Sequence, residues 1–91
     1  MKRTTADEKA HMGRIAELPC AVCGNSPVQV HHLPTQGGKR NHYRTIPLCS
    51  YHHTDGPYSE AVHQGRRSFE SRYGTEESMW VATNKILDMT V

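Results

Sequence analysis

Three cysteines and one histidine form two short pairs at the spacing of metal ligands. Cys20 and Cys23 are separated by two residues, and the same spacing separates Cys49 from His52. A tight turn can aim two such ligands at one ion, and thiolate and imidazole donors suit tetrahedral zinc. Because protein would fill all four positions, this zinc would be structural. Unrelated free cysteines are the weaker alternative, since both pairs have ligand spacing and Gly24 follows the first.

More histidines lie beside these pairs. His31 and His32 are adjacent in an expected strand, so their side chains should point to opposite faces or diverge at the strand end. One could then hold a second ion while the other faces a substrate. Two surface histidines are the plain alternative, but the zinc would draw this pair against the segment that carries His52. His53 follows in that segment and is the alternative fourth zinc ligand.

The first expected element is a short helix at residues 5–18. Thr5 and Glu8 fit a capping box, and Pro19 ends the helix. The cysteine pair that follows lies in a tight turn, where Gly24 can adopt a positive φ.

Two short strands are expected next, at residues 28–33 and 45–49. They are joined by a polar loop that contains Gly37 and Gly38. Pro47 weakens the second strand or places it at a sheet edge. A short turn or helix at 50–53 should then end near Gly56.

Two further helices complete the expected order. Ser59 can cap a helix that runs to Tyr73, with Val62 and Phe69 on its apolar stripe. Thr75 starts a final helix at about 76–88. The apolar face of this helix would consist of Met79, Ala82, Ile86 and Met89.

Size and composition indicate one small domain over residues 1–91, with its core at 20–74. Hydrophobic residues make up 35% of the chain, so the core is marginal and metal ligation would help to stabilise it. Three cysteines are an odd number, which argues against a disulfide framework. No apolar run suits a membrane span or a signal peptide, so we expect a soluble cytoplasmic protein without membrane contact.

The positive charge is concentrated in one stretch of the chain. Between residues 36 and 73, six lysines and arginines outnumber three carboxylates, within a total net charge of +2. Such a stretch fits phosphate contacts, although an ordinary solvated surface is the alternative. No base-reading element is evident, so any DNA binding should lack sequence specificity. The candidate DNA contacts are Lys39, Arg40, Arg44, Arg66 and Arg67.

The combined pattern resembles a known family. Cys20-x2-Cys23-Gly24, His31-His32-Leu33, Ile46-Pro47-Leu48-Cys49 and His52-His53 follow one another as in the HNH (ββα-metal, or His-Me finger) endonucleases. The chain looks closest to the phage recombination-enhancement nucleases called Ref and related prophage proteins. This resemblance implies an α+β fold, a zinc-stapled ββα-metal domain with flanking N- and C-terminal helices. It also implies hydrolysis of DNA phosphodiester bonds, with a recombinase filament as a partner.

The resemblance also assigns roles. The second histidine of the HNH pair is the general base, so His32 would take a proton from water, a task that suits a neutral imidazole. His31 and His53 would ligate one divalent ion, magnesium, manganese or another metal. His63 would be a third ligand or a phosphate contact. Asn41 is the nearest counterpart of the asparagine that holds the loop in place.

Two other functions use the same residues. A non-catalytic zinc-binding module could dock on nucleic acid or protein, with the remaining histidines as bystanders. A toxin of the HNH type would share the chemistry and differ only in its biology. A binding module has no need for His31 and His32 opposite His53, so a second metal site distinguishes it from a nuclease.

Overall fold

A computed structural model describes residues 4–35 and 40–89, which form a small α+β fold, as expected. Two loop glycines and one candidate DNA contact, Gly37, Gly38 and Lys39, lie outside the described residues. A π-helical turn (Tyr51–Asp55) and a 3-10 turn (Val62–Gln64) lie between the second strand and the second helix. The remaining elements are α1 (Ala6–Ala16), β1 (Gln29–His32), β2 (Thr45–Leu48), α2 (Arg66–Tyr73) and α3 (Glu76–Met89).

The two strands pair antiparallel, in a register that places His31 opposite Ile46. All four residues of β2 are buried, whereas β1 buries only His31, which is 2% exposed. Pro47 is accommodated because the described sheet has only two strands, so each strand has an unpaired edge. The carbonyl of Pro47 accepts a hydrogen bond from the N–H of Ala21 at 2.9 Å, which joins the cysteine turn to β2.

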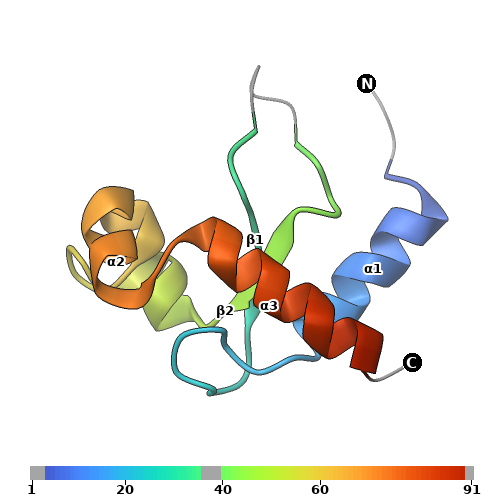
Figure 1. Cartoon of the computed structure of the whole chain (residues 1–91), viewed down its shortest axis with the longest axis horizontal. Coiled ribbons are helices and arrows are strands. Elements are labelled where there is room, and N and C mark those ends of the chain that lie inside the picture. Colours follow the sequence, from blue (N-terminus) through green and yellow to red (C-terminus); the bar gives the residue numbers. More distant parts are fainter. Residues whose placement is uncertain (1–3, 36–39, 90–91) are drawn as a thin grey trace.

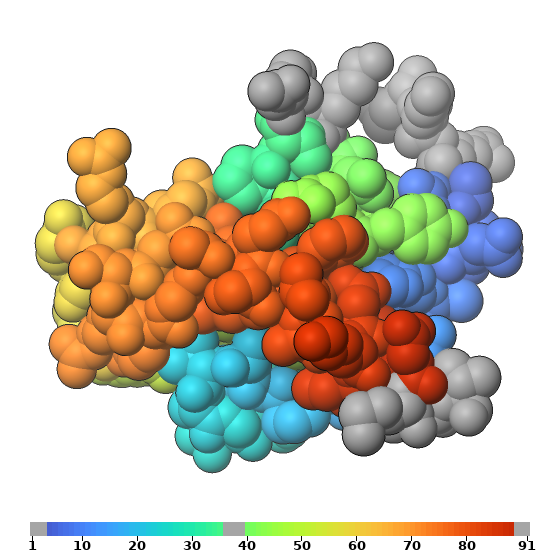
Figure 2. Space-filling model, viewed as in Figure 1, coloured from blue at the N-terminus to red at the C-terminus, as the bar shows by residue number. Residues whose placement is uncertain are grey.

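The helices surround this hairpin. In Figure 1, α3 crosses in front of the hairpin, with α1 on one side of the hairpin and α2 on the other. Both α1 and α3 contact β2, and α2 packs on the 3-10 turn. Arg14 of α1 donates a hydrogen bond to the carbonyl of Leu87 in α3 at 3.0 Å. Figure 2 shows α2 and α3 forming most of one face, with the cysteine-turn segment below them.

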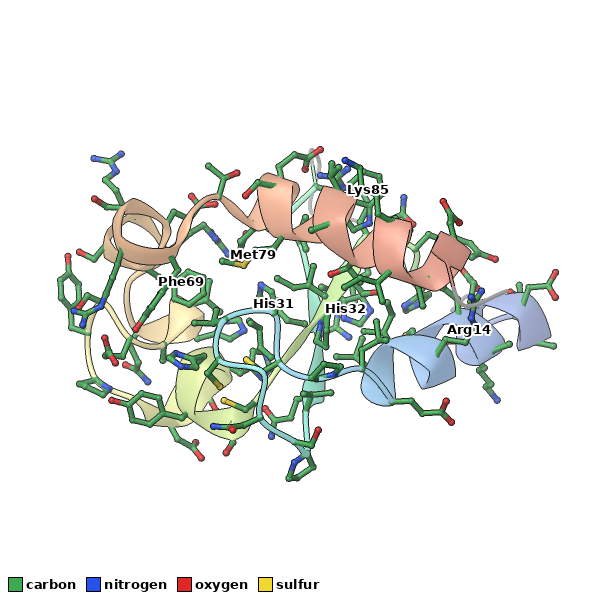
Figure 3. All side chains as sticks on the ribbon, turned by 60° about the horizontal axis from the view of Figure 1, so that its bottom comes forward. Arg14, His31, His32, Phe69, Met79 and Lys85 are labelled. Carbon is green, nitrogen blue, oxygen red and sulfur yellow. The ribbon has the colours of Figure 1, made fainter. Side chains whose placement is uncertain are left out.

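The core is small and lies between the hairpin, α2 and α3. Phe69 is fully buried and packs with Met79, and Figure 3 shows both on the same side of β1 as His31, with His32 on the other side. The buried cluster consists of Cys20, Leu33, Ile46, Leu48, Val62, Phe69 and Met79. One of the cysteines is therefore part of the core itself.

The expected helix from residue 59 to Tyr73 is wrong in its first half. Ser59 has a φ of 74° and Ala61 is extended, so this stretch holds only the 3-10 turn at Val62–Gln64 before α2 begins at Arg66. The reason is tertiary: Ala61 and Val62 are buried, and the carbonyl of Glu60 accepts a hydrogen bond from a histidine ring. Helical propensity is too weak to oppose such contacts.

The expected apolar face of α3 is only partly correct. Met79 is buried, but Ala82 and Ile86 are exposed, and the side chain of Met89 lies outside the described part. Thr83 is buried instead, and its hydroxyl is satisfied because it donates to the carbonyl of Met79 at 2.8 Å. None of the helices within the described ranges is long and apolar enough to cross a membrane.

The capping box at the start of α1 is confirmed. The N–H of Glu8 donates to Oγ1 of Thr5 at 3.1 Å, and the N–H of Thr5 donates to Oε1 of Glu8 at 2.8 Å. Toward the other end of this helix, Ile15 is 1% exposed and is the only residue of α1 that is buried. Docking of α1 therefore depends mainly on this side chain.

We expect Ile15→Ala to lower the free energy of unfolding by about 2–5 kcal/mol, because it removes a fully buried side chain. Urea unfolding followed by circular dichroism measures the change. Lys9→Ala, on the exposed side of the same helix, is the control and should change stability by less than about 0.5 kcal/mol. Equal stability of the two variants would mean that Ile15 does not anchor α1.

Candidate metal centres

Three of the four predicted zinc ligands lie together. The thiols of Cys20, Cys23 and Cys49 are all within 4.8 Å of one another, and the Sγ atoms of Cys23 and Cys49 are 3.7 Å apart. The first two are held in a turn that is closed by the N–H of Gly24 donating to the carbonyl of Cys20 at 2.9 Å, with Gly24 at a φ of 76° as expected. The third follows β2 directly. We call these residues the cysteine group.

The thiols of this group differ in their ease of ionisation. Burial would raise the pKa of Cys20, but backbone N–H groups of Cys49, Cys23 and Val22 outweigh it, and the pKa is lowered. The pKa of Cys49 is raised, first by burial and then by the neighbouring thiols. The thiol of Cys20 therefore ionises readily, whereas the thiol of Cys49 ionises only against the repulsion of its neighbours. A cation removes that cost, and a set of thiolates is the donor type that zinc prefers.

His52, the predicted fourth ligand, is buried but is not a member of this group. Its Nδ1 lies 2.8 Å from the carbonyl oxygen of Glu60, and its ring packs edge-on against Tyr51 and Tyr73. When Nδ1–H donates to that carbonyl, Nε2 carries the free lone pair. A backbone carbonyl on the second ring nitrogen is the usual support of a metal-binding histidine. The zinc role of His52 stays a prediction.

Three other histidines form a second group. His31, His53 and His63 have ligating nitrogens within 4.8 Å of one another, and they come from β1, the π-helical turn and the 3-10 turn. The Nε2 atoms of His53 and His63 are 3.1 Å apart. Two nitrogens bound to one ion at the usual bond length lie roughly 2.9–3.4 Å apart. The donor set of this histidine group therefore fits a metal ion.

The lowered pKa values of His53 and His63 favour metal binding. Burial, followed by the charges of His31 and His63, lowers the pKa of His53 to about 4. Burial also lowers the pKa of His63, with contributions from His31 and Arg66 and an opposing one from Glu76. Neutral imidazoles have the lone pair that a metal requires.

Two residues that were not predicted from the sequence hold the histidine group from outside. Nε2 of His31 lies 2.8 Å from Oε1 of Glu76, and Nδ1 of His53 lies 2.5 Å from Oε1 of Gln29. Gln29 precedes His31 by two residues in β1, so strand alternation could have placed them on one face. Glu76 had no comparable signal, because an acidic residue at a helix start is common.

His32 lines a pocket of about 270 Å³. Its Nε2 is 2.9 Å from Nδ1 of His42, a contact that the sequence did not reveal. Burial lowers the pKa of His32, and the charges of Arg40, His42 and His31 lower it further. The pocket is lined by His31, His32, Leu33, Pro34, Thr35, Arg40 and His63, so it lies beside two members of the histidine group.

Asn41 holds its own loop. Its Oδ1 accepts a hydrogen bond from the N–H of Tyr43, and its carbonyl accepts one from the N–H of Arg44, both at 3.0 Å. These bonds form the turn that carries His42 toward His32. The side chain of Asn41 therefore bonds within its own turn, and its role as the counterpart of the HNH asparagine stays a prediction.

The candidate DNA contacts that the structure describes differ in their partners. Arg44 stacks 4.7 Å from the ring of Trp80 and pairs with Glu77, so it joins the loop to α3. Arg66 pairs with Glu76 at 3.3 Å. Within residues 4–35 and 40–89, Arg40 and Arg67 form no ion pair, and both are exposed. Of these two arginines, Arg40 lines the pocket of His32.

The fold and these side chains define a small α+β protein with a cysteine group and a histidine group, each of which could hold a metal ion. A family model described as recombination enhancement, RecA-dependent nuclease matches residues 4–88. The chain therefore belongs to this nuclease family, and the predicted resemblance to the recombination-enhancement nucleases is confirmed. No match was found among curated proteins.

Substitution of the two adjacent histidines should separate the metal centres. We expect His52→Ala to weaken zinc retention and His53→Ala to retain zinc, because both ring nitrogens of His53 are engaged outside the cysteine group. Zinc content after dialysis against a mild chelator measures the difference. Zinc retained by His52→Ala but lost by His53→Ala would reverse the assignment.

Proposed function

We propose that the protein is a metal-dependent DNA endonuclease of the HNH, or ββα-metal, type, with His32 as general base. The observation that carries this proposal is the convergence of His31, His53 and His63 beside the pocket that contains His32. Family membership supports a nucleic-acid substrate. The order of hairpin, helical turn and histidines also supports the ββα-metal type.

The histidine group would hold one divalent ion, which would stabilise negative charge on the phosphate and the departing oxygen. Three imidazoles favour a transition metal over magnesium, whose preferred ligands are oxygens. Manganese, which accepts both donor types, is the best first choice for an assay, with magnesium for comparison. His63 acts here as the third ligand, because its Nε2 lies 3.1 Å from that of His53.

The task of His32 is to remove a proton from the attacking water. Its lowered pKa keeps the ring neutral near pH 7, so that it can accept this proton. When Nε2–H donates to Nδ1 of His42, the lone pair of Nδ1 is left free for the water. Arg40, in the same pocket, would bind a phosphate oxygen of the DNA and orient it.

The cysteine group would hold the structural zinc, with His52 as its fourth ligand. His53 is the less suitable of the two neighbours, because its Nδ1 faces Gln29 and its Nε2 faces His63. Such an ion would stabilise a domain whose core is small.

DNA binding should depend on charge more than on base sequence. Among the residues described here, the exposed arginines Arg40 and Arg67 are available to phosphates, and Arg66 can also leave its ion pair because its side chain is 47% exposed. The family's description names dependence on RecA. We therefore include a recombinase filament as the partner that would direct cleavage.

His32→Ala should abolish cleavage of plasmid DNA in the presence of manganese while leaving the fold and the zinc content intact. The substitution removes the proposed general base but none of the proposed metal ligands. Nicking assays with and without chelator measure this. His11→Ala, a histidine on α1, is the matched control and should cut DNA like the wild type. If His32→Ala cuts as well as the wild type, the general-base assignment is wrong.

Arg40→Ala should reduce cleavage and weaken DNA binding by roughly 1 kcal/mol or more, because it removes a charge-assisted contact to phosphate. Arg72→Ala, which removes the partner of Glu60 outside the pocket, is the control. Fluorescence anisotropy with a labelled duplex at fixed salt compares the two variants. Equal losses of DNA affinity in the two variants would indicate that total positive charge, and not a specific contact of Arg40, determines binding.

A further inference from the structure

The carboxylate of Glu76 is unusually well bonded for an acidic residue at a helix start. The residue is 3% exposed, although it is the first residue of α3. Its Oε1 lies 2.8 Å from Nε2 of His31, and its Oε2 lies 3.3 Å from Nε of Arg66. Its backbone N–H donates to Oε2 of Glu70 at 2.6 Å. Glu76 is therefore held by β1, through His31, and by α2, through Arg66 and Glu70.

We infer that Glu76 is the positioning residue of His31, and that it orients this ring for the divalent ion. This inference rests on the metal site of the proposed function. With Nε2–H donated to Glu76, the proton is kept off Nδ1, and the Nδ1 lone pair is the one left for a metal. A carboxylate behind a ligating histidine fixes both the tautomer and the ring orientation, and it makes the ligand more basic.

A purely structural ion pair explains these contacts less well. A buried carboxylate is costly unless it is fully bonded, and most acidic residues at helix starts stay in water. The next residue, Glu77, behaves in that ordinary way, since it is exposed and pairs with Arg44 on the surface. The burial of Glu76 is explained by its contact with His31, which is itself 2% exposed.

Direct metal ligation by Glu76 is also a weaker explanation. Its oxygens are not among the atoms that lie within 4.8 Å of one another in the histidine group. Both oxygens are engaged elsewhere, by His31 and Arg66. Glu76 therefore acts through His31, and docking of α3 becomes a condition for forming the site.

Titration of the zinc-loaded protein with Co²⁺ tests this inference without DNA. Visible d–d absorption reports binding to nitrogen ligands, and the absence of a sulfur-to-cobalt band excludes exchange into the cysteine group. We expect Glu76→Ala to weaken Co²⁺ binding about 10–100-fold. Glu76→Gln keeps an oxygen that accepts the His31 N–H, so it should bind Co²⁺ nearly as tightly as the wild type. Glu77→Ala is the matched control and should match the wild type.

Long-range ¹⁵N NMR of the histidine rings in the cobalt-free wild-type protein gives a second readout that does not depend on any variant folding. We expect His31 to carry its proton on Nε2. Three results would overturn the inference: unchanged Co²⁺ affinity in Glu76→Ala, equally weak binding by Glu76→Gln and Glu76→Ala, or a proton on Nδ1 of His31. Co²⁺ binding that depends on Glu76 without DNA cleavage would refute the nuclease proposal and leave this inference standing.

Discussion

The antiparallel pairing of β1 with β2 positions side chains of both the cysteine group and the histidine group, the two candidate metal centres. Its register puts His31 opposite Ile46, where the His31 ring is buried, and both His31 and the adjacent His32 line the pocket. The same strand β2 binds the cysteine turn through the carbonyl of Pro47 and delivers Cys49 to it. A slip of one residue would exchange His31 with His32 and separate the thiols. The hairpin therefore positions side chains of both candidate metal centres.

Much of this arrangement could be predicted because it is local. Ligand spacing, the positive φ of Gly24 and the capping box of Thr5 depend on residues a few positions apart. The grouping of His31 with His53 was also expected, but only from the resemblance to a family. Long-range contacts cannot be recognised from spacing in this way. Glu76 bonds to His31, which is 45 positions away in the sequence, and His42 contacts His32 from the other side of a loop. The break in the expected helix after Ser59 was missed because burial of Ala61 and Val62 overrides α-helical propensity there.

The arginines show a similar limit. Charge and position in the sequence make Arg40, Arg44 and Arg66 equivalent candidates for phosphate contacts. In the fold, Arg44 contacts Trp80 and Glu77, and Arg66 pairs with Glu76, whereas Arg40 lines the pocket. Only the packing of α3 creates this distinction, since all three of these partners lie on that helix. A cation's role depends on which carboxylates the fold brings near it.

The π-helical turn Tyr51–Asp55 links the two centres within a single turn of the chain. His52 is buried against Glu60 and Tyr73, while its neighbour His53 belongs to the histidine group. Such wide turns occur often at functional sites, where they let adjacent residues serve different purposes. The two centres should therefore not be independent. If the cysteine group holds zinc, its loss would release the segment after Cys49, move His53 and so disturb the histidine group. Under the proposed function, loss of cleavage in a cysteine variant is therefore informative about catalysis only when the zinc content of that variant is known.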